Sequence, residues 1–202
     1  SHPRPPPSHP REVPTMPVHV YLAGVEVFAP DARERAERTR ELCRRYGLEP
    51  ISPLDKGDVT EKSGAGAGST ALADAIYAKN IALIERADVI VADLNHFRGP
   101  EPDSGTSFEV GYAVGRGKPS YVHSADGDTA VDRVRAFHGP VTATPTGYVD
   151  AEGMSVEDFG SPFNLMLSSS STVVRGDLEA CLARVAADVE AGVLAGTTSS
   201  VR

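Results

Sequence analysis

Two carboxylates near the middle of the chain, Asp103 and Glu109, flank a predicted helix start in a pattern that suits covalent chemistry. A loop rich in glycine and proline over 95–104 leads into a helix predicted over 105–116. Glu109 falls in the first or second turn of this helix, where partial positive charge and backbone N–H groups favour an ionised carboxylate. Such a carboxylate can attack an anomeric carbon. Glu109 is therefore suited to such an attack; the simpler alternative is a helix cap at Asp103 and a surface charge at Glu109.

The segments around these carboxylates alternate between strand-like and helix-like patterns. Strands are predicted over 18–24, 49–52, 88–93, 119–123 and 172–174, and helices over 30–46, 69–86, 105–116 and 177–190. This alternation predicts an α/β fold: a doubly wound, mostly parallel five-stranded sheet of the flavodoxin or Rossmann kind, in a single domain. Ligands of such sheets bind at the carboxyl ends of the strands, so we expect the site just after Tyr21, Ser52 and Asp93.

The remaining segments are predicted to be tails and loops. Residues 1–16 contain six prolines and little apolar content, so we expect a disordered leader there. The folded domain is predicted over 17–191, with a flexible tail over 192–202. Long loops are expected over 56–68 and 126–158.

Composition excludes several classes of function. The net charge of −8 argues against a nucleic-acid-binding surface, because such surfaces need clustered Lys and Arg. No apolar run approaches the ~18 residues of a membrane span, and no signal peptide opens the chain, so we expect a cytoplasmic protein without membrane contact. Cys43 and Cys181 fall on apolar helix faces and are expected to be buried thiols. Neither belongs to a metal-binding motif, so we expect no metal and no cofactor.

Three separated segments carry a resemblance to one family. Residues 97–111, from Phe97 through Asp103 and Glu109 to Gly111, resemble the catalytic signature of the nucleoside 2-deoxyribosyltransferases. Residues 20–31 resemble the first strand of that family and the approach to its first helix. Residues 161–167 resemble its Asn-Leu-Met element. The resemblance covers about residues 18–189 and leaves out both tails.

This resemblance implies a role for each matching residue. Glu109 would attack C1′ of a 2′-deoxyribonucleoside and form a 2-deoxyribosyl ester, which a second base resolves, or water slowly if no base is present. Tyr21 would hold Glu109 by a hydrogen bond, although a core tyrosine is an equal reading of its residue type. Asp103 would accept the sugar 5′-OH. Asn164 from a neighbouring subunit would join it, and Met166 would wall the same pocket; without the motif, Asn164 would be read as a helix cap or loop residue.

Further residues and partners follow from the same resemblance. Phe28, Gly24 and Gly105 would line the substrate site. The expected partners are 2′-deoxyribonucleosides, free nucleobases and a second copy of the chain, which makes the protein at least a dimer. The preference for purine or pyrimidine bases depends on the shape of a pocket that the loops over 56–68 and 126–158 would build, and the sequence does not give that shape.

One position departs from the family pattern. Better-known members carry an aspartate before the central strand that can protonate the leaving base, and this chain has Asn80 there. A carboxamide donates hydrogen bonds but is not an acid in this sense, although Asn80 can still touch the base. Asp93 is our first candidate for the proton donor and Asp55 the second. Asp93 as a loop-anchoring carboxylate is an equal alternative.

Three other functions remain open at this point. Related enzymes hydrolyse the N-glycosidic bond of nucleoside 5′-monophosphates, but they tend to have serine where this chain has Asp103. A carboxylate 4 Å from a phosphate would be repelled by roughly 4 kcal/mol per charge pair at an effective dielectric near 20. Gly105, Thr106 and Glu109 also resemble part of a phosphoribohydrolase signature whose paired glycines are missing here. The last alternative is a catalytically silent nucleotide sensor on the same fold.

Overall fold

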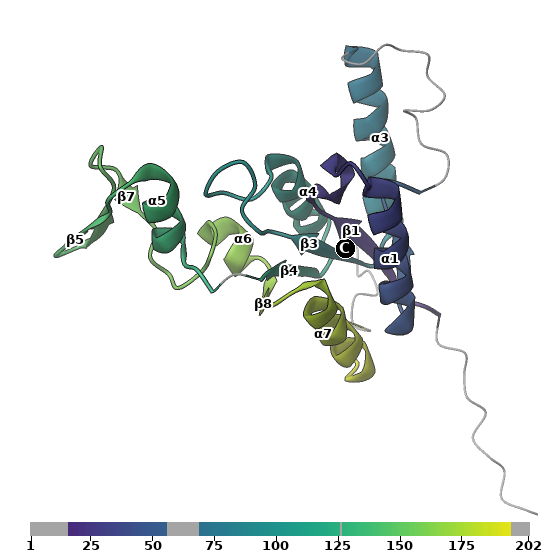
Figure 1. Ribbon diagram of the computed structural model, residues 1–202. Helices are drawn as coiled ribbons and strands as arrows, with labels where there is room; N and C mark the ends of the chain where they lie inside the picture. The colour runs from purple at the N-terminus through teal and green to yellow at the C-terminus, as the bar shows by residue number, and fades with distance from the viewer. Residues whose placement is uncertain (1–15, 56–68, 126, 195–202) are drawn as a thin grey trace, which may run out of the picture.

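Five parallel strands form the central sheet of the computed structural model, which describes residues 16–55, 69–125 and 127–194 (Figure 1). The strands are β1 (His19–Ala23), β2 (Glu49–Ile51), β3 (Val89–Asp93), β4 (Ser120–Ser124) and β8 (Thr172–Arg175). Their order in the sheet is β2-β1-β3-β4-β8, and every neighbouring pair is parallel. The predicted doubly wound α/β sheet is therefore confirmed. From β1 the chain first adds β2 on one side of the sheet and then β3 on the other side, so the strand order reverses at β1. Ligands of such folds bind at this switch point.

Two pairs of helices cover the two faces of this sheet. Helices α3 (Thr70–Arg86) and α4 (Ser104–Gly115) pack on the face that carries Tyr21 and Ile90. Helices α1 (Ala32–Arg45) and α7 (Leu178–Glu190) pack on the face that carries Val20 and Val91. Successive strand residues point to opposite faces, so adjacent positions on one strand serve different cores. Cys43 and Cys181 are buried, unlinked thiols, one on α1 and one on α7.

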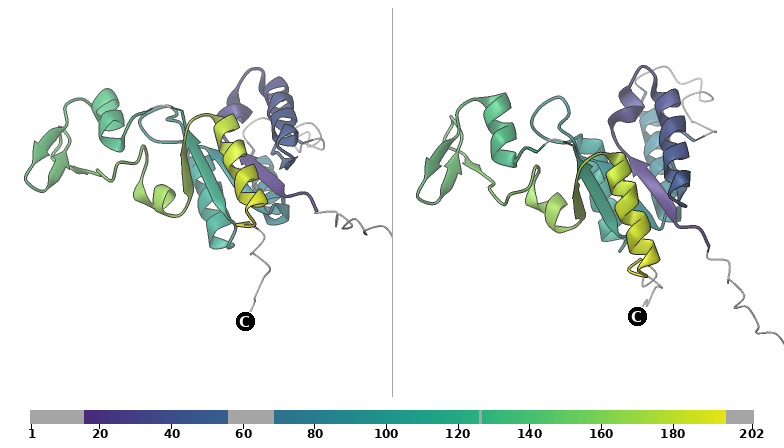
Figure 2. Two further views of the ribbon diagram at one scale, coloured as in Figure 1. Left: turned by 90° about the horizontal axis from the view of Figure 1, so that it is seen from below. Right: turned by 60° about the horizontal axis from the view of Figure 1, so that its bottom comes forward.

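The expectation of a loop over 126–158 was wrong. This segment forms α5 (Ala130–His138) and a small antiparallel sheet of β5 (Thr142–Thr144), β6 (Gly147–Val149) and β7 (Ser155–Val156). Both views in Figure 2 show these elements standing out from the main sheet. The strands have two or three residues each and none of their residues is buried, so they leave no hydrophobic alternation in the sequence. Helix α5, however, begins with a Thr129–Asp132 capping box, which is a readable signal.

Other boundaries agree with the sequence to within two or three residues. The structure adds two short elements that were not predicted, the 3₁₀ helix η1 (Val25–Phe28) and α6 (Leu165–Ser169). The predicted loop over 56–68 and nearly all of the predicted leader and tail lie outside the described residues. Within the described part of the chain, no helix has both the length and the apolar character that a membrane crossing requires.

Candidate active site

Glu109 lies in the second turn of α4, and side chains from two other elements donate hydrogen bonds to it. The Tyr21 hydroxyl, on β1, donates to Glu109 Oε1 over 2.8 Å. The Asn80 side-chain amide, on α3, donates to the same oxygen over 3.3 Å. The carboxylate is thus held between the sheet and both helices of this face. The contact expected between Tyr21 and Glu109 is present, and Asn80 joins it.

Burial dominates the electrostatics of this group. It raises the pKa of Glu109 to about 7, and the negative charge of Asp103 adds to that rise, while the hydrogen bonds from Tyr21 and Asn80 lower the pKa. The expectation that the helix start keeps Glu109 ionised is therefore corrected, because the helix dipole acts mainly within the first turn. Burial and the nearby carboxylate also raise the pKa of Tyr21, so Tyr21 stays protonated and donates.

Glu109 lines a cavity of about 440 Å³, here called the Glu109 cavity. Its apolar wall consists of Val27, Phe28, Pro53, Leu54 and Ile76, and its polar groups belong to Lys79, Asn80, Asp103, Thr106 and Glu109. Gly24 and Gly105 complete the lining. A mostly apolar cavity of this volume with a few convergent polar groups is typical of a small-molecule site.

One end of the Glu109 cavity is formed by the N-terminus of α4. Asp103 Oδ2 accepts hydrogen bonds from the Thr106 backbone N–H over 2.8 Å and from Thr106 Oγ1 over 3.0 Å. A Cβ at Gly105 would lie 3.1 Å from the same oxygen, so glycine leaves room for this cap. Asp103 therefore both caps the helix and presents a carboxylate to the cavity.

Phe28 forms part of the cavity wall and is fixed by the loop that follows β3. Its ring stacks on Phe97 with centroids 5.5 Å apart. The Arg98 guanidinium lies 4.6 Å from the Phe97 centroid and 5.4 Å from that of Phe28. Arg98 adopts a left-handed backbone conformation, with φ of 57°. Phe97 and Arg98 of the loop after β3 thus hold the Phe28 ring in the cavity wall.

Asp93 does not line the Glu109 cavity. Its Oδ1 accepts from the Asn95 backbone N–H over 2.9 Å and from Asn95 Nδ2 over 2.6 Å. A Cβ at Gly24 would lie 3.1 Å from Asp93 Cβ, so glycine allows the two strand ends to approach closely. The structure places Asp93 as the anchor of the loop after β3, which was the alternative reading of this residue.

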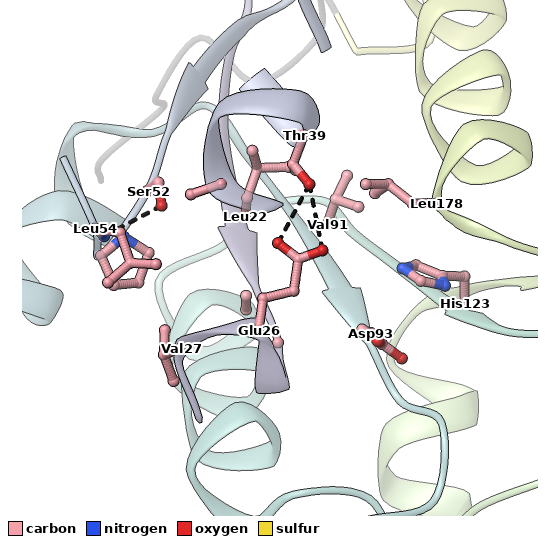
Figure 3. Close-up of a pocket in the computed structure, with 14 residues that line it drawn as sticks. Leu22, Glu26, Val27, Thr39, Ser52, Leu54, Val91, Asp93, His123 and Leu178 are labelled. Carbon is pink, nitrogen blue, oxygen red and sulfur yellow. Dashed lines mark hydrogen bonds between the residues drawn. The ribbon is translucent and has the colours of Figure 1, made fainter. Parts of the chain in front are cut away.

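Asp93 instead faces a second, smaller cavity of about 70 Å³ on the α1 and α7 side of the sheet, here called the His123 cavity (Figure 3). His123 is paired in register with Asp93 and is buried, and its Nδ1 has no hydrogen-bond partner among the described residues. Burial lowers the pKa of His123 despite the nearby charge of Asp93. Across the cavity, the Thr39 hydroxyl donates to the Glu26 carboxylate over 3.2 Å. Metal-binding groups of three or more His, Cys, Asp or Glu are absent from the described residues.

Asp55, the second candidate for the proton donor, also lies outside the Glu109 cavity. Its carboxylate accepts from Arg40 Nε over 2.9 Å and from the Ser52 backbone N–H over 3.0 Å. It lines a polar groove beside α1 and β2. Asp55 thus fixes the turn after β2 rather than facing Glu109.

Comparison with known proteins identifies the family of the chain. The profile of the nucleoside 2-deoxyribosyltransferase family matches residues 20–166. The chain belongs to this family. A 2-desoxiribosyltransferase from Leishmania mexicana is 35% identical, covers 85% of this chain and 98% of its own, and superposes with a TM-score of 0.64. An uncharacterized protein of Schizosaccharomyces pombe is 32% identical over 118 residues, which is 58% of this chain and only 54% of that protein.

Family membership establishes the broad class of activity. Members of the family act on nucleosides and nucleobases, so this chain is a nucleoside-processing enzyme that transfers or hydrolyses a glycosyl group. The matched range includes the strand end at Tyr21 and the helix that carries Asp103 and Glu109. The elements that form the Glu109 cavity are therefore family elements.

The Asn-Leu-Met segment lies away from the Glu109 cavity of its own chain. Asn164 caps α6 by accepting from the Met166 backbone N–H over 2.9 Å, and its amide donates to Glu157 over 2.8 Å. The Met166 side chain is 71% exposed. Neither Asn164 nor Met166 lines the cavity of its own chain, so their role in a neighbouring subunit stays a prediction.

Six residues that line the cavity were not predicted as site residues: three follow strand ends, Val27, Pro53 and Leu54, and three lie on helices, Ile76, Lys79 and Thr106. Helical spacing was a usable signal for two of them, because Ile76, Lys79 and Asn80 follow the i, i+3, i+4 pattern of one helix face. For Thr106 the sequence offered a weaker indication, namely a hydroxyl side chain three residues after the predicted helix cap Asp103.

Proposed function

We propose that this enzyme transfers 2-deoxyribose between nucleobases through a covalent ester on Glu109. The observation that carries the proposal is the Glu109 carboxylate, held by Tyr21 and Asn80 in a cavity of about 440 Å³ that has Asp103 at one end. This arrangement supplies a positioned nucleophile and a polar group for the far end of a sugar. The same cavity has an apolar wall suited to a base.

The sugar is proposed to bind with its 5′-OH at Asp103. A carboxylate accepts a hydrogen bond from a hydroxyl, whereas a 5′-phosphate at about 4 Å would be repelled by roughly 4 kcal/mol per charge pair. Asp103 therefore favours nucleosides over nucleoside 5′-monophosphates as substrates. With C5′ at Asp103, C1′ points toward Glu109 and the base toward Phe28, Leu54 and Ile76.

The reaction then follows the retaining scheme of glycosyl transfer. Both donors engage Oε1 of Glu109, so we assign the attack on C1′ to Oε2. The Oε2–C1′ bond forms as the C1′–N bond breaks, and the electron pair of that bond stays on the base nitrogen. A second base then attacks C1′ and releases Glu109 as a carboxylate, so two inversions retain the configuration. Water replaces the second base slowly when no base is present.

A second copy of the chain is proposed to complete the site. Met166 is 71% exposed, and α6, which carries it, packs against α4, the helix of Glu109. Phe108 and Tyr77 are 52% and 56% exposed, and their rings lie 6.2 Å apart on the same side of the sheet. Exposed apolar side chains grouped in this way favour an interface. Asn164 and Met166 would then reach the cavity of the partner.

Subunit complementation tests this shared site. Glu109→Ala and Asn164→Ala should each be nearly inactive alone, and co-expression of the two should restore activity, because mixed dimers contain one site with both native residues. No recovery in mixed dimers that form at the normal yield would place Asn164 outside the shared site.

The activity itself is tested with 2′-deoxyinosine and free adenine. Formation of 2′-deoxyadenosine is expected, and Glu109→Ala should abolish it. Release of hypoxanthine without 2′-deoxyadenosine would identify a hydrolase, and the absence of both products would favour a binding module. 2′-Deoxyinosine 5′-monophosphate, assayed in parallel, should be the poorer substrate.

A further inference from the structure

The Glu109 cavity has one cationic side chain, Lys79, among the described residues that line it. Lys79 lies on α3 directly before Asn80, and its ammonium group donates to the Pro53 carbonyl over 2.7 Å. An ammonium group has three N–H donors, so it can hold Pro53 and a ligand at once. Pro53 and Leu54, just after β2, line the same cavity.

The order of the strands fixes which end of the cavity Lys79 occupies. Pro53 follows β2, Gly24 follows β1, and Asp103 ends the loop after β3, while the sheet runs β2-β1-β3. Lys79 is tied to the β2 end through Pro53, and Asp103 lies at the β3 end. Glu109, bonded to Tyr21 on β1, lies between them. A nucleoside with its 5′-OH at Asp103 therefore places its base at Lys79.

The leaving base needs a compensating positive charge at this end. When the C1′–N bond breaks, its electron pair stays on the base, which departs as an anion unless an acid protonates it. Asn80 is not such an acid, and Asp93 and Asp55 lie outside the cavity. The ionisable groups among the described lining residues are Glu109, Asp103 and Lys79, and the first two are carboxylates assigned to the sugar.

We propose, on the basis of the function proposed above, that Lys79 binds the base and stabilises it as an anion while it leaves. The Lys79 ammonium donates a hydrogen bond to an oxo oxygen or a ring nitrogen of the base and neutralises the charge that develops there. The released base takes up its proton from water. In the reverse half-reaction, an acceptor base loses that proton to water and is held as the nucleophile by the same ammonium. The enzyme thus replaces an acid with a fixed cation.

Two substrates with different leaving groups test this role. When the C1′–N bond of 2′-deoxyinosine breaks, hypoxanthine departs as an anion. 7-Methyl-2′-deoxyguanosine is already a cation, so its base departs as a neutral molecule and needs no compensating positive charge. Lys79→Met should lower kcat/KM for 2′-deoxyinosine on the order of 10²-fold, the usual loss for one preorganised electrostatic donor. It should change kcat/KM for 7-methyl-2′-deoxyguanosine by less than about 3-fold. Lys79→Arg keeps the charge and should retain more activity on 2′-deoxyinosine than Lys79→Met.

Lys118 offers a matched control. Its ammonium also donates to a backbone carbonyl, that of Ala87 over 2.6 Å, but it does not line the Glu109 cavity. Lys118→Met should affect both substrates equally. An equal loss on both substrates for Lys79→Met would mean that Lys79 has a structural role alone, and no loss on either would mean that it does not reach the base. If wild type processes neither substrate, or if Glu109→Ala processes both, the proposed function itself fails.

Discussion

Opposite faces of one sheet carry the Glu109 cavity and the His123 cavity, and Gly24, Val27, Pro53 and Leu54 line both. Each contains an ionisable group, the partly buried Glu109 or the buried His123, and burial shifts the pKa of both groups in the direction that favours the uncharged form. Glu109 has two hydrogen-bond donors aimed at its carboxylate and about 440 Å³ beside it. The ring nitrogen Nδ1 of His123 has no partner among the described residues, and the adjoining space is about 70 Å³.

This contrast shows why a shifted pKa alone does not identify an active site. A reacting group also needs neighbours that favour its working state and room for the reacting molecule. Within the described residues, only the Glu109 side of the sheet provides both the hydrogen-bond donors and the space for a reacting molecule. The His123 side is better understood as part of the packing between β4 and the helices α1 and α7.

The largest expected effect separates the two faces directly. Glu109→Gln should lower kcat on the order of 10⁴-fold or more, because it removes the nucleophile, whereas His123→Gln should change kcat only a few-fold. Initial rates with 2′-deoxyinosine and adenine measure both variants. A comparable loss in the two variants would contradict the assignment of chemistry to one face.

Stability provides the control for Glu109→Gln. The pKa of Glu109 is raised from 4.5 to about 7, so its protonated form stabilises the fold at low pH, and that contribution is lost as the pH rises through about 7. The variant stays neutral at every pH. At pH 8 it should be more stable than wild type by up to about 3 kcal/mol, and at pH 4 the two should be alike, in urea unfolding at each pH.

The next effect concerns the sugar end of the Glu109 cavity. Asp103→Ser removes a negative charge and leaves a hydroxyl that can cap α4 and donate to a phosphate. Activity on 2′-deoxyinosine should fall and relative activity on its 5′-monophosphate should rise. The ratio of the two specificity constants should change on the order of 10²-fold, measured at fixed ionic strength. An unchanged ratio would leave Asp103 as a helix cap and reopen the nucleotide hydrolase alternative.

A smaller effect is expected in the pH profile. Wild-type kcat/KM should rise with pH through an apparent pKa near 7 as Glu109 ionises. Tyr21→Phe removes a hydrogen bond that lowers this pKa, so the acid limb should move up by roughly one to two pH units. Activity lost at pH 7 should then return in part at pH 9. A uniform loss at all pH values would mean that Tyr21 acts on something other than the ionisation of Glu109.

The smallest effect belongs to His123. Its pKa lies below the ordinary value because of burial, so the unfolded chain binds a proton more readily and stability is lost as the pH falls below about 6.5. His123→Gln should flatten this part of the stability curve and leave the pH profile of activity in place. Thermal unfolding between pH 5 and 8 measures the difference. A matching shift in the activity profile would link the two cavities.

Much of this picture was accessible from the sequence because it depends on local patterns. Alternating apolar segments predicted the five strands and their helices, and a helix start after Asp103 predicted where Glu109 lies. The segment that forms α5 and β5–β7 was missed because its strands bury no residue and so leave no periodic signal. Short strands of this kind depend on each other rather than on a hydrophobic core.

The electrostatics of the site was less accessible. A helix start predicted an ionised Glu109, but the pKa depends on how deeply the fold buries it, which no local pattern shows. Asp93, at the end of β3, was predicted as the proton donor to the leaving base. Side chains alternate between the two faces of a sheet, however, and Asp93 lies on the face opposite Glu109. Lys79 shares a helix face with Ile76 and Asn80, but its hydrogen bond to the Pro53 carbonyl, 26 residues away, has no local signal in the sequence.

The most direct test of the central claim is the intact mass of the protein after incubation with 2′-deoxyinosine and no acceptor base. If Glu109 is the nucleophile, wild type quenched in acid should gain the mass of one deoxyribosyl unit, and peptide mapping should place the gain at Glu109. Addition of adenine before the quench should remove it. Turnover of 2′-deoxyinosine without any mass gain, or a gain that persists in Glu109→Ala, would contradict the covalent mechanism.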